Sequence, residues 1–394
     1  MEAVTIVTIK NKIPLYKKEE EANAIELIEL EEVGYEIVSQ KDLYSIGDKA
    51  ILIQPDYCLP DIPLFDSYIR PNGDESKSML GKIEGKPRRI RAKKFNMSKE
   101  PNGDSIYSNG ILLPYLEVQE YINNKRKICL DLHLFDITAE LNITKYEEPD
   151  KLGGLKLGAT SPFPVGIYKT DEPNIYNQLG RIEFPITLVG SEKIDGSSIT
   201  IGIKNGEGFI CSRNMQKLLF YNKCVGFRNK TFIEKLLFWK KPNLKVYERV
   251  SNDQDDFVHY GKPYLDGLLN QDPLVSNYKD IVLRGELNGA HLKGSGNKNN
   301  PARLEQPNIK FFGIDSIEEG VAKKMPYSLF KICANQLNLP TTKEVFNKEF
   351  NSFEEIINEC NGYFKTNMIE GIVVRSLDSK FSAKVMNLEY DSKK

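Results

Sequence analysis

The pentapeptide Glu192-Lys193-Ile194-Asp195-Gly196 is the stretch of this sequence from which its fold is best inferred. A lysine in a turn between two strands can act as a nucleophile when burial or nearby charges let its amine lose a proton. Asp195, two residues later, offers the carboxylate oxygens that Mg²⁺ and Mn²⁺ prefer. The pattern Lys-x-Asp-Gly also occurs by chance in ordinary polar turns, so its meaning depends on the motifs that follow it.

Five further motifs follow this turn, and they supply cations, carboxylates at strand ends and an aromatic pair. They are SRN at 212–214, VLRGE at 282–286, KFFGID at 310–315, EGIVVR at 370–375 and FSAKV at 381–385. This ordered set resembles the nucleotidyltransferase signature that ATP-dependent ligases share with mRNA capping enzymes. The last motif departs from many ligases, which carry Lys-x-Lys where this chain has Ser382 and Lys384.

The resemblance implies a covalent lysyl-AMP intermediate, in which Lys193 is the nucleophile that attacks the α-phosphate of ATP. It also implies that three carboxylates hold Mg²⁺ or Mn²⁺, directly or through water, and that two cations neutralise phosphates. The carboxylates are Asp195, Glu286 and Glu370, and the cations are Arg213 and Lys384. Lys384 is further expected to lower the pKa of Lys193 by repulsion between like charges. Outside this motif context, Glu286 and Glu370 would be interpreted as solvated acids at strand ends.

The adenine base is expected to lie between Phe312, which stacks on one face, and Val373, which closes the other. The remaining nucleotide contacts are expected from Glu192, at the edge of the base, and Ile194. Phe311 is the alternative partner of the base, because Phe311 and Phe312 alternate along one strand and only one of them points away from the core. Asp315 fits a structural role as well as a functional one.

Composition limits the functions open to the chain. Its 394 residues include 54 Lys and Arg against 55 Asp and Glu, a net charge of −1, so contact with nucleic acid depends on local patches. The six cysteines form no Cys-x-x-Cys pair, which argues against a zinc site. The sequence has no apolar run of about 18 residues and no signal-peptide pattern, so an intracellular protein, cytoplasmic or nuclear, is expected.

The residue pattern predicts an α+β protein with largely antiparallel sheets and two domains. Residues 1–150 contain short strand-like runs separated by Asp, Gly, Pro and Asn clusters, which predicts an OB-like β-barrel. A Gly-rich linker is expected at 151–162. Residues 163–394 are expected to form a nucleotidyltransferase domain with antiparallel sheets, of the ATP-grasp-like ligase type.

Local signals place three elements in the second domain. The pair Asn205-Gly206 predicts a hairpin turn between two strands. One helix is expected after Pro326. A second is expected to begin at Ser352, where Glu355 completes a capping box, and to end at Gly362.

The order of the domains narrows the choice among nucleotidyltransferases. DNA ligases and capping enzymes are similar in that both carry an OB-fold after the last motif. In this sequence ten residues follow Lys384, which is too few for an OB-fold. The strand-rich region lies at the front instead, as in the Naegleria-type RNA ligases. Segments similar to that family extend along nearly the whole chain, at 34–38, 46–53, 88–94, 108–114, 143–149 and 169–177. Asn174 stands where that family is expected to have an arginine.

The resemblance implies an ATP-dependent RNA ligase that joins 3′-hydroxyl and 5′-phosphate RNA ends with the help of Mg²⁺ or Mn²⁺. A monomer is expected. Three alternatives remain at this point: a ligase for nicks in DNA or mixed strands, a capping guanylyltransferase, and an RNA-binding module without catalysis.

Two basic regions are candidate RNA surfaces. One lies in a long insertion at 215–280, where basic residues are interleaved with aromatic ones, as in surfaces that bind single strands. Its candidate contacts are Lys217, Lys223 and Arg228, and those of the front domain are Arg89, Arg91 and Lys93. The alternative for the insertion is an amphipathic helix at 232–239 with a solvated basic face.

Overall fold

The computed structural model describes residues 3–78, 80, 88–146, 159–229, 243–270, 280–292 and 297–392 of the chain. The chain divides into two compact units, which both combine helices with antiparallel sheets. The N-terminal unit consists of Met1–Asp150, Asn174–Glu183 and Asp391–Lys393, and the second unit of Lys151–Pro173, Phe184–Tyr390 and Lys394. The predicted α+β class is therefore confirmed. Within the described ranges, no helix is long and apolar enough to cross a membrane.

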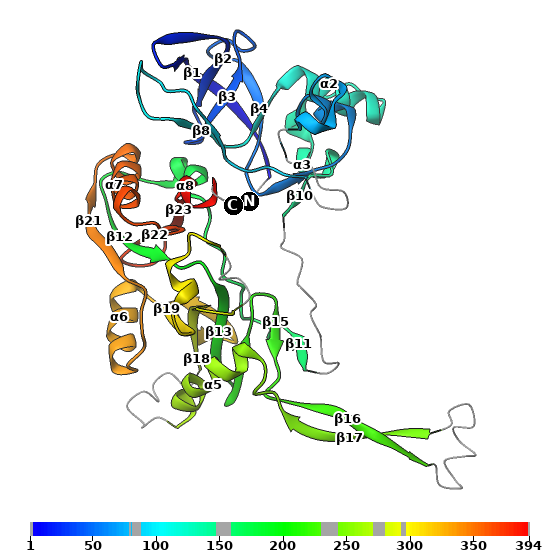
Figure 1. Ribbon diagram of the computed structural model, residues 1–394, viewed down its shortest axis with the longest axis vertical. Coiled ribbons are helices and arrows are strands. Elements are labelled where there is room, and N and C mark those ends of the chain that lie inside the picture. Colours follow the sequence, from blue (N-terminus) through cyan, green and yellow to red (C-terminus); the bar gives the residue numbers. More distant parts are fainter. Residues whose placement is uncertain are drawn as a thin grey trace. The chain divides into compact units, whose positions relative to one another are not determined.

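The N-terminal unit is built on a five-stranded sheet in the order β3-β2-β1-β4-β9 (Figure 1). Its strands are β1 (Val4–Lys17), β2 (Glu20–Leu30), β3 (Glu36–Gln40), β4 (Lys49–Ile53) and β9 (Ile111–Pro114). The first half of β1 pairs with β4 and its second half with β2. One face of the sheet packs against helix α2 (Tyr115–Arg126), which buries Val118 and Ile122 there.

The expected OB-like β-barrel is not confirmed, because the five-stranded sheet does not close on itself in the described part of the unit. The other strands belong to a separate three-stranded sheet, β10-β5-β6, and a two-stranded sheet, β7-β8. Their bounds are β5 (Tyr57–Leu59), β6 (Arg88–Arg89), β7 (Lys93–Phe95), β8 (Ile106–Ser108) and β10 (Thr144–Lys145). Strands of two or three residues offer too few hydrogen bonds to continue one sheet around a closed ring.

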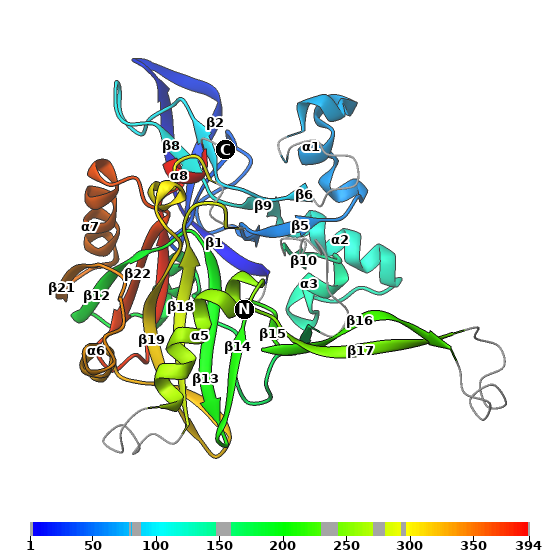
Figure 2. The same cartoon turned by 60° about the horizontal axis from the view of Figure 1, so that its bottom comes forward.

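The second unit contains a seven-stranded sheet in the order β11-β15-β14-β13-β18-β19-β20 (Figure 2). Its strands are β11 (Thr160–Pro162), β13 (Ser197–Lys204), β14 (Glu207–Cys211), β15 (Met215–Lys217), β18 (Ile281–Asn288), β19 (Asn308–Glu318) and β20 (Val321–Lys324). Helix α5 (Asp256–Leu269) packs on β13 and β14. The predicted hairpin turn is confirmed, because Asn205 and Gly206 have the positive φ angles, 53° and 78°, that a type I′ turn requires.

A four-stranded sheet, in the order β21-β12-β22-β23, completes the second unit. Its strands are β12 (Ile186–Lys193), β21 (Glu344–Phe350), β22 (Gly371–Ser376) and β23 (Ser382–Met386). Helix α7 (Phe353–Thr366) contacts β21 and β22. Helix α6 (Tyr327–Gln336) confirms the helix that was predicted after Pro326.

The Ser352 cap at the start of α7 forms as predicted, but the returning bond of the capping box goes to the residue before the cap. The Ser352 hydroxyl accepts a hydrogen bond from the Glu355 amide at 3.2 Å, and the Glu355 carboxylate accepts one from the Asn351 amide at 2.8 Å. The predicted end of the helix was wrong, because α7 continues past Gly362 to Thr366. A glycine inside a helix costs only about 1 kcal/mol, which the apolar face of α7 outweighs by burying Phe353 and Ile356.

A ribbon of two antiparallel strands, β16 (Phe220–Asn229) and β17 (Asn243–Ser251), projects from the second unit beside α5 (Figures 1 and 2). It belongs to neither of the larger sheets. The helix expected at 232–239 lies outside the described residues.

Candidate active site

Lys193 ends β12 in the four-stranded sheet and shares a face of it with two other predicted nucleotide contacts. Lys193 pairs with Gly371, and Ser191 pairs with Val373, which in turn pairs with Lys384. Residues directly opposite in an antiparallel sheet share a face, as do alternate residues of one strand. Lys193, Val373 and Lys384 therefore point to the same side of the sheet.

The Lys193 amine lies among carboxylates rather than beside another cation. It donates a hydrogen bond to Glu370 Oε2 at 2.5 Å. Burial opposes the charge on the amine, but the carboxylates of Glu370, Glu286 and Asp195 outweigh it and raise the pKa of Lys193. The prediction that Lys384 lowers the pKa of Lys193 was wrong, because the Lys384 amine lies 3.5 Å from an Asp171 oxygen instead.

Glu286 comes from the other sheet, near the end of β18, and contributes to the same charged group. Burial raises its pKa to about 8, and the neighbouring charges of Glu370 and Asp195 act in the same direction. The cations of Lys193 and Arg213 act against that rise. The carboxylates therefore crowd a partly buried space in which a further cation would be favoured.

Gly196 explains how the turn after Lys193 reaches Glu286. A Cβ atom at this position would lie 2.5 Å from the Leu287 carbonyl oxygen and 3.0 Å from Cγ of Glu286. Only glycine lets the backbone of the turn pass this close to β18. The glycine of the Lys-x-Asp-Gly pattern thus brings the lysine and Glu286 together.

Tyr390, which the sequence analysis did not single out, holds the turn from the other side. Its hydroxyl donates a hydrogen bond to Asp195 Oδ2 at 2.7 Å, and its side chain is 1% exposed. Asn300 donates to the backbone oxygen of Asp195 at 2.8 Å. Tyr390 belongs to helix α8 (Leu388–Ser392), and no motif spacing pointed to it.

Replacing Tyr390 with phenylalanine is expected to slow the chemistry of Lys193 about tenfold, because Asp195 and the turn lose a fixed position while the buried ring stays. The measurement is the rate of lysine modification by nucleotide. Tyr363→Phe is the matched control, since Tyr363 donates a hydrogen bond from its hydroxyl to Glu192 at 2.7 Å on the opposite face of the same strand. Equal rates in Tyr390→Phe and the wild-type protein would contradict a positioning role.

Phe311 and Phe312 differ in burial, and Phe312 is the one that points away from the core, as predicted. Phe311 is fully buried in the core and meets the Tyr264 ring edge-on at 4.9 Å. Phe312 is half-buried, lines a cavity of the second unit and has no cross-strand partner in β18, because a bulge interrupts the register there. Its backbone oxygen accepts a hydrogen bond at 2.5 Å from Arg375, which is buried.

Glu192 does not share the face of Lys193. Successive residues of a strand point to opposite sides, and the Glu192 carboxylate accepts a hydrogen bond from Tyr363 on α7. The Lys343 amine lies 3.6 Å from the same carboxylate. In this structure the side chain therefore contacts the helix that covers the back of the sheet, and its contact with the base edge stays a prediction. Ile194 is half-buried in the turn.

A buried ion pair supports the sheet from which Glu286 and Phe312 come. Arg284 donates from Nε to Asp315 Oδ2 at 2.8 Å, and each of the two side chains is 2% exposed. Arg284 also donates to the backbone oxygen of Tyr168 at 2.9 Å and to the hydroxyl of Thr200 at 3.2 Å. Of the two roles left open for Asp315, the structure supports the structural one.

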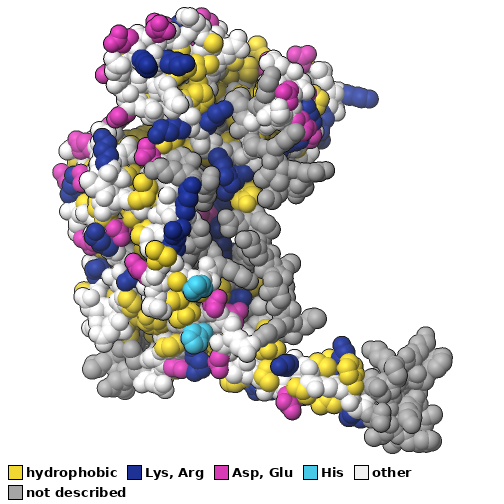
Figure 3. All heavy atoms as spheres, viewed as in Figure 1, with side chains coloured by type: hydrophobic (Ala, Val, Ile, Leu, Met, Phe, Trp, Pro, Cys, Tyr) yellow, Lys and Arg dark blue, Asp and Glu magenta, His cyan; other side chains and the backbone are white. Residues whose placement is uncertain are grey.

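The predicted RNA contacts of the insertion are distributed over two elements. Lys217 ends β15, where its amine lies 3.1 Å from Asp255 Oδ2 and 5.2 Å from the centre of the Phe257 ring. Lys223 and Arg228 are exposed on strand β16 of the ribbon. Figure 3 shows that hydrophobic side chains and Lys and Arg side chains gather along this ribbon.

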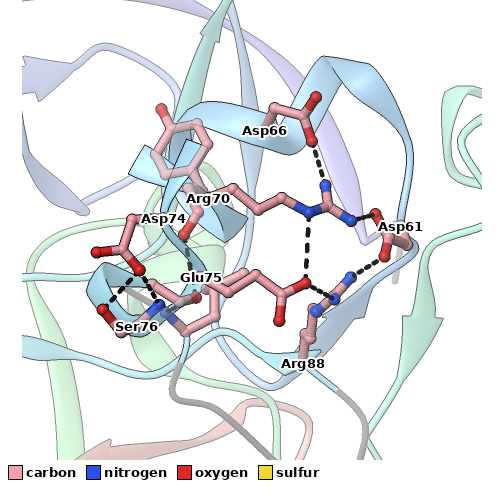
Figure 4. Close-up of polar contacts among 10 residues, drawn as sticks. Asp61, Asp66, Arg70, Asp74, Glu75, Ser76 and Arg88 are labelled. Atoms are coloured by element: carbon pink, nitrogen blue, oxygen red, sulfur yellow. Dashed lines mark hydrogen bonds and ion pairs between the residues drawn. The ribbon is translucent and has the colours of Figure 1, made fainter. Parts of the chain in front are cut away.

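The basic run of the N-terminal unit is partly neutralised by acids. Arg88 and Arg70 lie in a network with Asp61 and Glu75 (Figure 4), and Arg88 Nη1 is 3.1 Å from Asp61 Oδ2.

The predicted RNA contacts Arg89, Arg91 and Lys93 differ from one another in exposure. Arg89 is held by Asp56, with Nε 3.0 Å from Oδ1, and its guanidinium lies 4.5 Å from the centre of the Tyr146 ring. Arg91 and Lys93 are exposed. Arg91 and Lys93 are therefore better placed than Arg89 to meet a phosphate.

Asn174 takes a structural position within the N-terminal unit. Its side-chain oxygen accepts a hydrogen bond from the Tyr176 amide at 3.2 Å and caps a 3₁₀ turn, Ile175–Arg181. Arg181 is exposed at the end of that turn.

Comparisons with known proteins show which family and which solved structures the chain is similar to. The family model described as RNA ligase matches residues 186–386, a little more than half of the chain. Solved structures of Naegleria gruberi RNA ligase, one with AMP and Mn and one with ATP and Mn, have TM-scores of 0.69 and 0.68 and 22% sequence identity. They cover 100% of this chain and 99% of their own. No curated protein matches. The chain belongs to the RNA ligase family.

Proposed function

We propose that the protein is an ATP-dependent RNA ligase that joins a 3′-hydroxyl to a 5′-phosphate through a covalent lysyl-AMP. The observation that carries this proposal is the position of the Lys193 amine, 2.5 Å from Glu370 and near Glu286, on the sheet face that also presents Val373 and Lys384. This arrangement combines a nucleophile with acids for a metal and a cation for phosphates.

ATP and a divalent metal are the proposed cofactors. Structures of the Naegleria gruberi enzyme contain ATP or AMP with Mn, and one contains pyrophosphate. In the described residues of this chain, no three His, Cys, Asp or Glu side chains form a metal site by themselves. Mg²⁺ typically takes one or two carboxylates together with substrate phosphates, so Glu286 and Glu370 fit it better than a set of three that includes Asp195.

In the first step, Lys193 Nζ bonds to the α-phosphorus of ATP as the bond to the leaving pyrophosphate breaks. The amine is an ammonium while it is paired with Glu370, so it must first give up a proton to solvent, and a divalent cation beside Glu370 would favour this loss by weakening the pairing. A divalent metal bound by Glu286 and Glu370 would neutralise their charge and that of the phosphates. Lys384 and Arg213 would balance the remaining phosphate charge, and Phe312 with Val373 would hold the adenine.

The two later steps return the enzyme to its starting state. An oxygen of the RNA 5′-phosphate attacks the phosphorus of lysyl-AMP, which frees Lys193 and leaves AMP on the RNA end. The 3′-hydroxyl of the neighbouring strand then attacks the RNA 5′-phosphorus, its proton passes to solvent, AMP leaves, and a phosphodiester remains. We also propose that residues 163–394 carry this chemistry and that residues 1–150, joined by 151–162, help to hold the RNA.

The charge of Glu286 predicts a specific pH dependence. Its folded-state pKa, about 8, is above its ordinary value, so its contribution to stability is present at low pH and is lost as the pH rises through about 8. With metal removed by EDTA, the free energy of unfolding is expected to fall by at least about 1 kcal/mol between pH 6 and pH 9. Added Mg²⁺ is expected to reverse most of this fall.

Urea unfolding measured at both pH values checks this prediction, and Glu286→Gln is its control. Glutamine does not titrate, so the variant should lose most of the difference between the two pH values. The raised pKa of Lys193 does not interfere, because its effect is confined to pH values above its ordinary pKa. A wild-type stability that is independent of pH in EDTA would contradict the prediction.

The proposed function is tested by transfer of label from ATP carrying a radioactive α-phosphate. The protein should become labelled with ATP and metal, and not with GTP labelled in the same way. Labelling by GTP would favour capping chemistry, and no labelling would favour an RNA-binding module. Sealing of a nick with RNA strands, compared with the same nick in DNA or mixed strands, then decides between the ligase classes.

A further inference from the structure

The ribbon formed by β16 and β17 has two chemically different faces. Its register pairs Phe220 with Ser251, Cys224 with Tyr247, and Phe227 with Lys245. Paired residues share a face, and the neighbouring pairs point to the other side. We call the first side the aromatic face. It consists of Phe220, Asn222, Cys224, Phe227, Lys245, Tyr247, Arg249 and Ser251 among the residues whose side chains are described.

Three aromatic rings on this face remain exposed to solvent. The exposed fractions are 46% for Phe220, 66% for Phe227 and 56% for Tyr247. The Arg249 guanidinium lies 4.9 Å from the centre of the Phe220 ring and covers it. Phe227 and Tyr247 are thus the rings with the most surface free for a planar ligand.

Charge is distributed unequally between the two faces. The aromatic face carries Lys245 and Arg249 and no acidic side chain among its described residues. On the opposite face, Lys223 is directly opposite Glu248 in the strand register, so that face carries an acidic side chain as well as basic ones. The aromatic face is consequently the side on which basic and aromatic groups occur together without an acid.

We propose that the aromatic face binds single-stranded RNA, with bases stacked on Phe227 and Tyr247 and phosphates held by Lys245 and Arg249. The inference rests on the proposed ligase function and assigns this surface to the strand of the RNA substrate beyond the ends that are joined. Exposed rings suit bases because every base offers a flat π face, and the two cations suit the backbone. The ribbon thus contacts RNA through a different side from the one that carries Lys223 and Arg228.

The experiment compares three double variants. Phe227→Leu with Tyr247→Leu removes the rings and keeps apolar side chains. Lys245→Gln with Arg249→Gln removes two charges from the aromatic face. Lys223→Gln with Arg228→Gln removes two charges from the opposite face, as a matched comparison. Dissociation constants for a fluorescein-labelled single-stranded RNA are measured by fluorescence anisotropy at several salt concentrations.

The three variants are expected to differ in affinity and in salt dependence. The ring variant should bind at least about tenfold more weakly with an unchanged salt slope, because stacking is not ionic. The variant of Lys245 and Arg249 should reduce the slope of log K against log salt by about 1.4, since each phosphate contact on a single strand contributes about 0.7. The variant of Lys223 and Arg228 should change the slope by less than half of that amount.

Three outcomes would overturn the inference. Wild-type affinity in the ring variant would exclude stacking on Phe227 and Tyr247. Equal slopes in the two charge variants would attribute binding to net charge alone. A self-association that the ring variant abolishes, with RNA affinity unchanged, would assign the face to a second copy of the chain.

Failure of the inference remains distinguishable from failure of the proposed function. Label transfer from ATP needs no RNA, so it reports on the ligase chemistry in the wild-type protein and on correct folding in each variant. A wild-type protein that takes up no label would reject the ligase function, whereas the anisotropy measurement would still test the aromatic face.

Discussion

Replacing Lys193 with alanine is expected to lower the transfer of AMP from ATP to the protein by at least about a thousandfold. The reason is that the bond to the α-phosphorus is proposed to form at Nζ, which alanine lacks. Lys384 shares the same sheet face but lies next to Asp171, 3.5 Å away, and belongs to β23, which β22 separates from β12. It is therefore not expected to substitute as the nucleophile. The measurement is the amount of radioactive protein after incubation with α-labelled ATP and metal.

A second assay separates loss of the nucleophile from loss of the fold. An RNA strand that already carries AMP on its 5′-phosphate does not require the lysine to be modified, so Lys193→Ala should still join it to a 3′-hydroxyl. Lys193→Arg is the companion variant, because it restores a positive charge near Glu370 without a usable nucleophile. Label on the alanine variant would show that another residue accepts AMP and would contradict the proposed role.

Replacing Asp315 with alanine is expected to lower the free energy of unfolding by about 3–5 kcal/mol, because Arg284 is left as a buried charge without its partner. The pair is 2% exposed on both sides, so water cannot compensate. Urea unfolding followed by circular dichroism measures the loss. Activity should decline with it, since Glu286 and Phe312 lie on the two strands that this pair joins.

The double variant Arg284→Met with Asp315→Leu is the control for this prediction. It removes both charges together, and buried ion pairs replaced by apolar groups of similar size are often as stable as the original. Its free energy of unfolding is expected to lie within about 1 kcal/mol of the wild-type value. A double variant as unstable as Asp315→Ala would mean that lost packing, and not the unpaired charge, causes the effect.

The parts of the fold that sequence patterns predicted are those governed by local rules. The turn at Asn205-Gly206 and the Ser352 cap depend on neighbouring residues, and both formed as expected. Strand β2 (Glu20–Leu30) was not predicted, because it buries Leu27 and Ile28 in succession and so shows no alternation of apolar and polar residues there. The expected barrel depended on long-range strand pairing, which sequence spacing does not determine.

The candidate site also combines residues that sequence motifs predicted with residues that they did not. Motif order predicted the residues that gather at Lys193, including Glu286 and Glu370, because each motif is tied to a strand end. Glu192 points to the side of the sheet opposite to Lys193, because consecutive residues of a strand alternate between its two faces. Tyr390 acts through a tertiary contact with Asp195, and no local signal in the last helix indicates it.

The two faces of strand β22 have different surroundings, which limits the changes in length that this segment can accept. Val373 points with Lys193 toward the site, whereas Ile372 and Val374 are buried on the side that α7 covers. Losing one codon within this strand would exchange the two sets, so that the apolar side chains face the proposed nucleotide site and the site residues face the helix. Loss of two codons would keep the alternation and shift it along the strand. Natural variation in this segment is therefore expected to be substitution, with changes in length confined to the loops on either side.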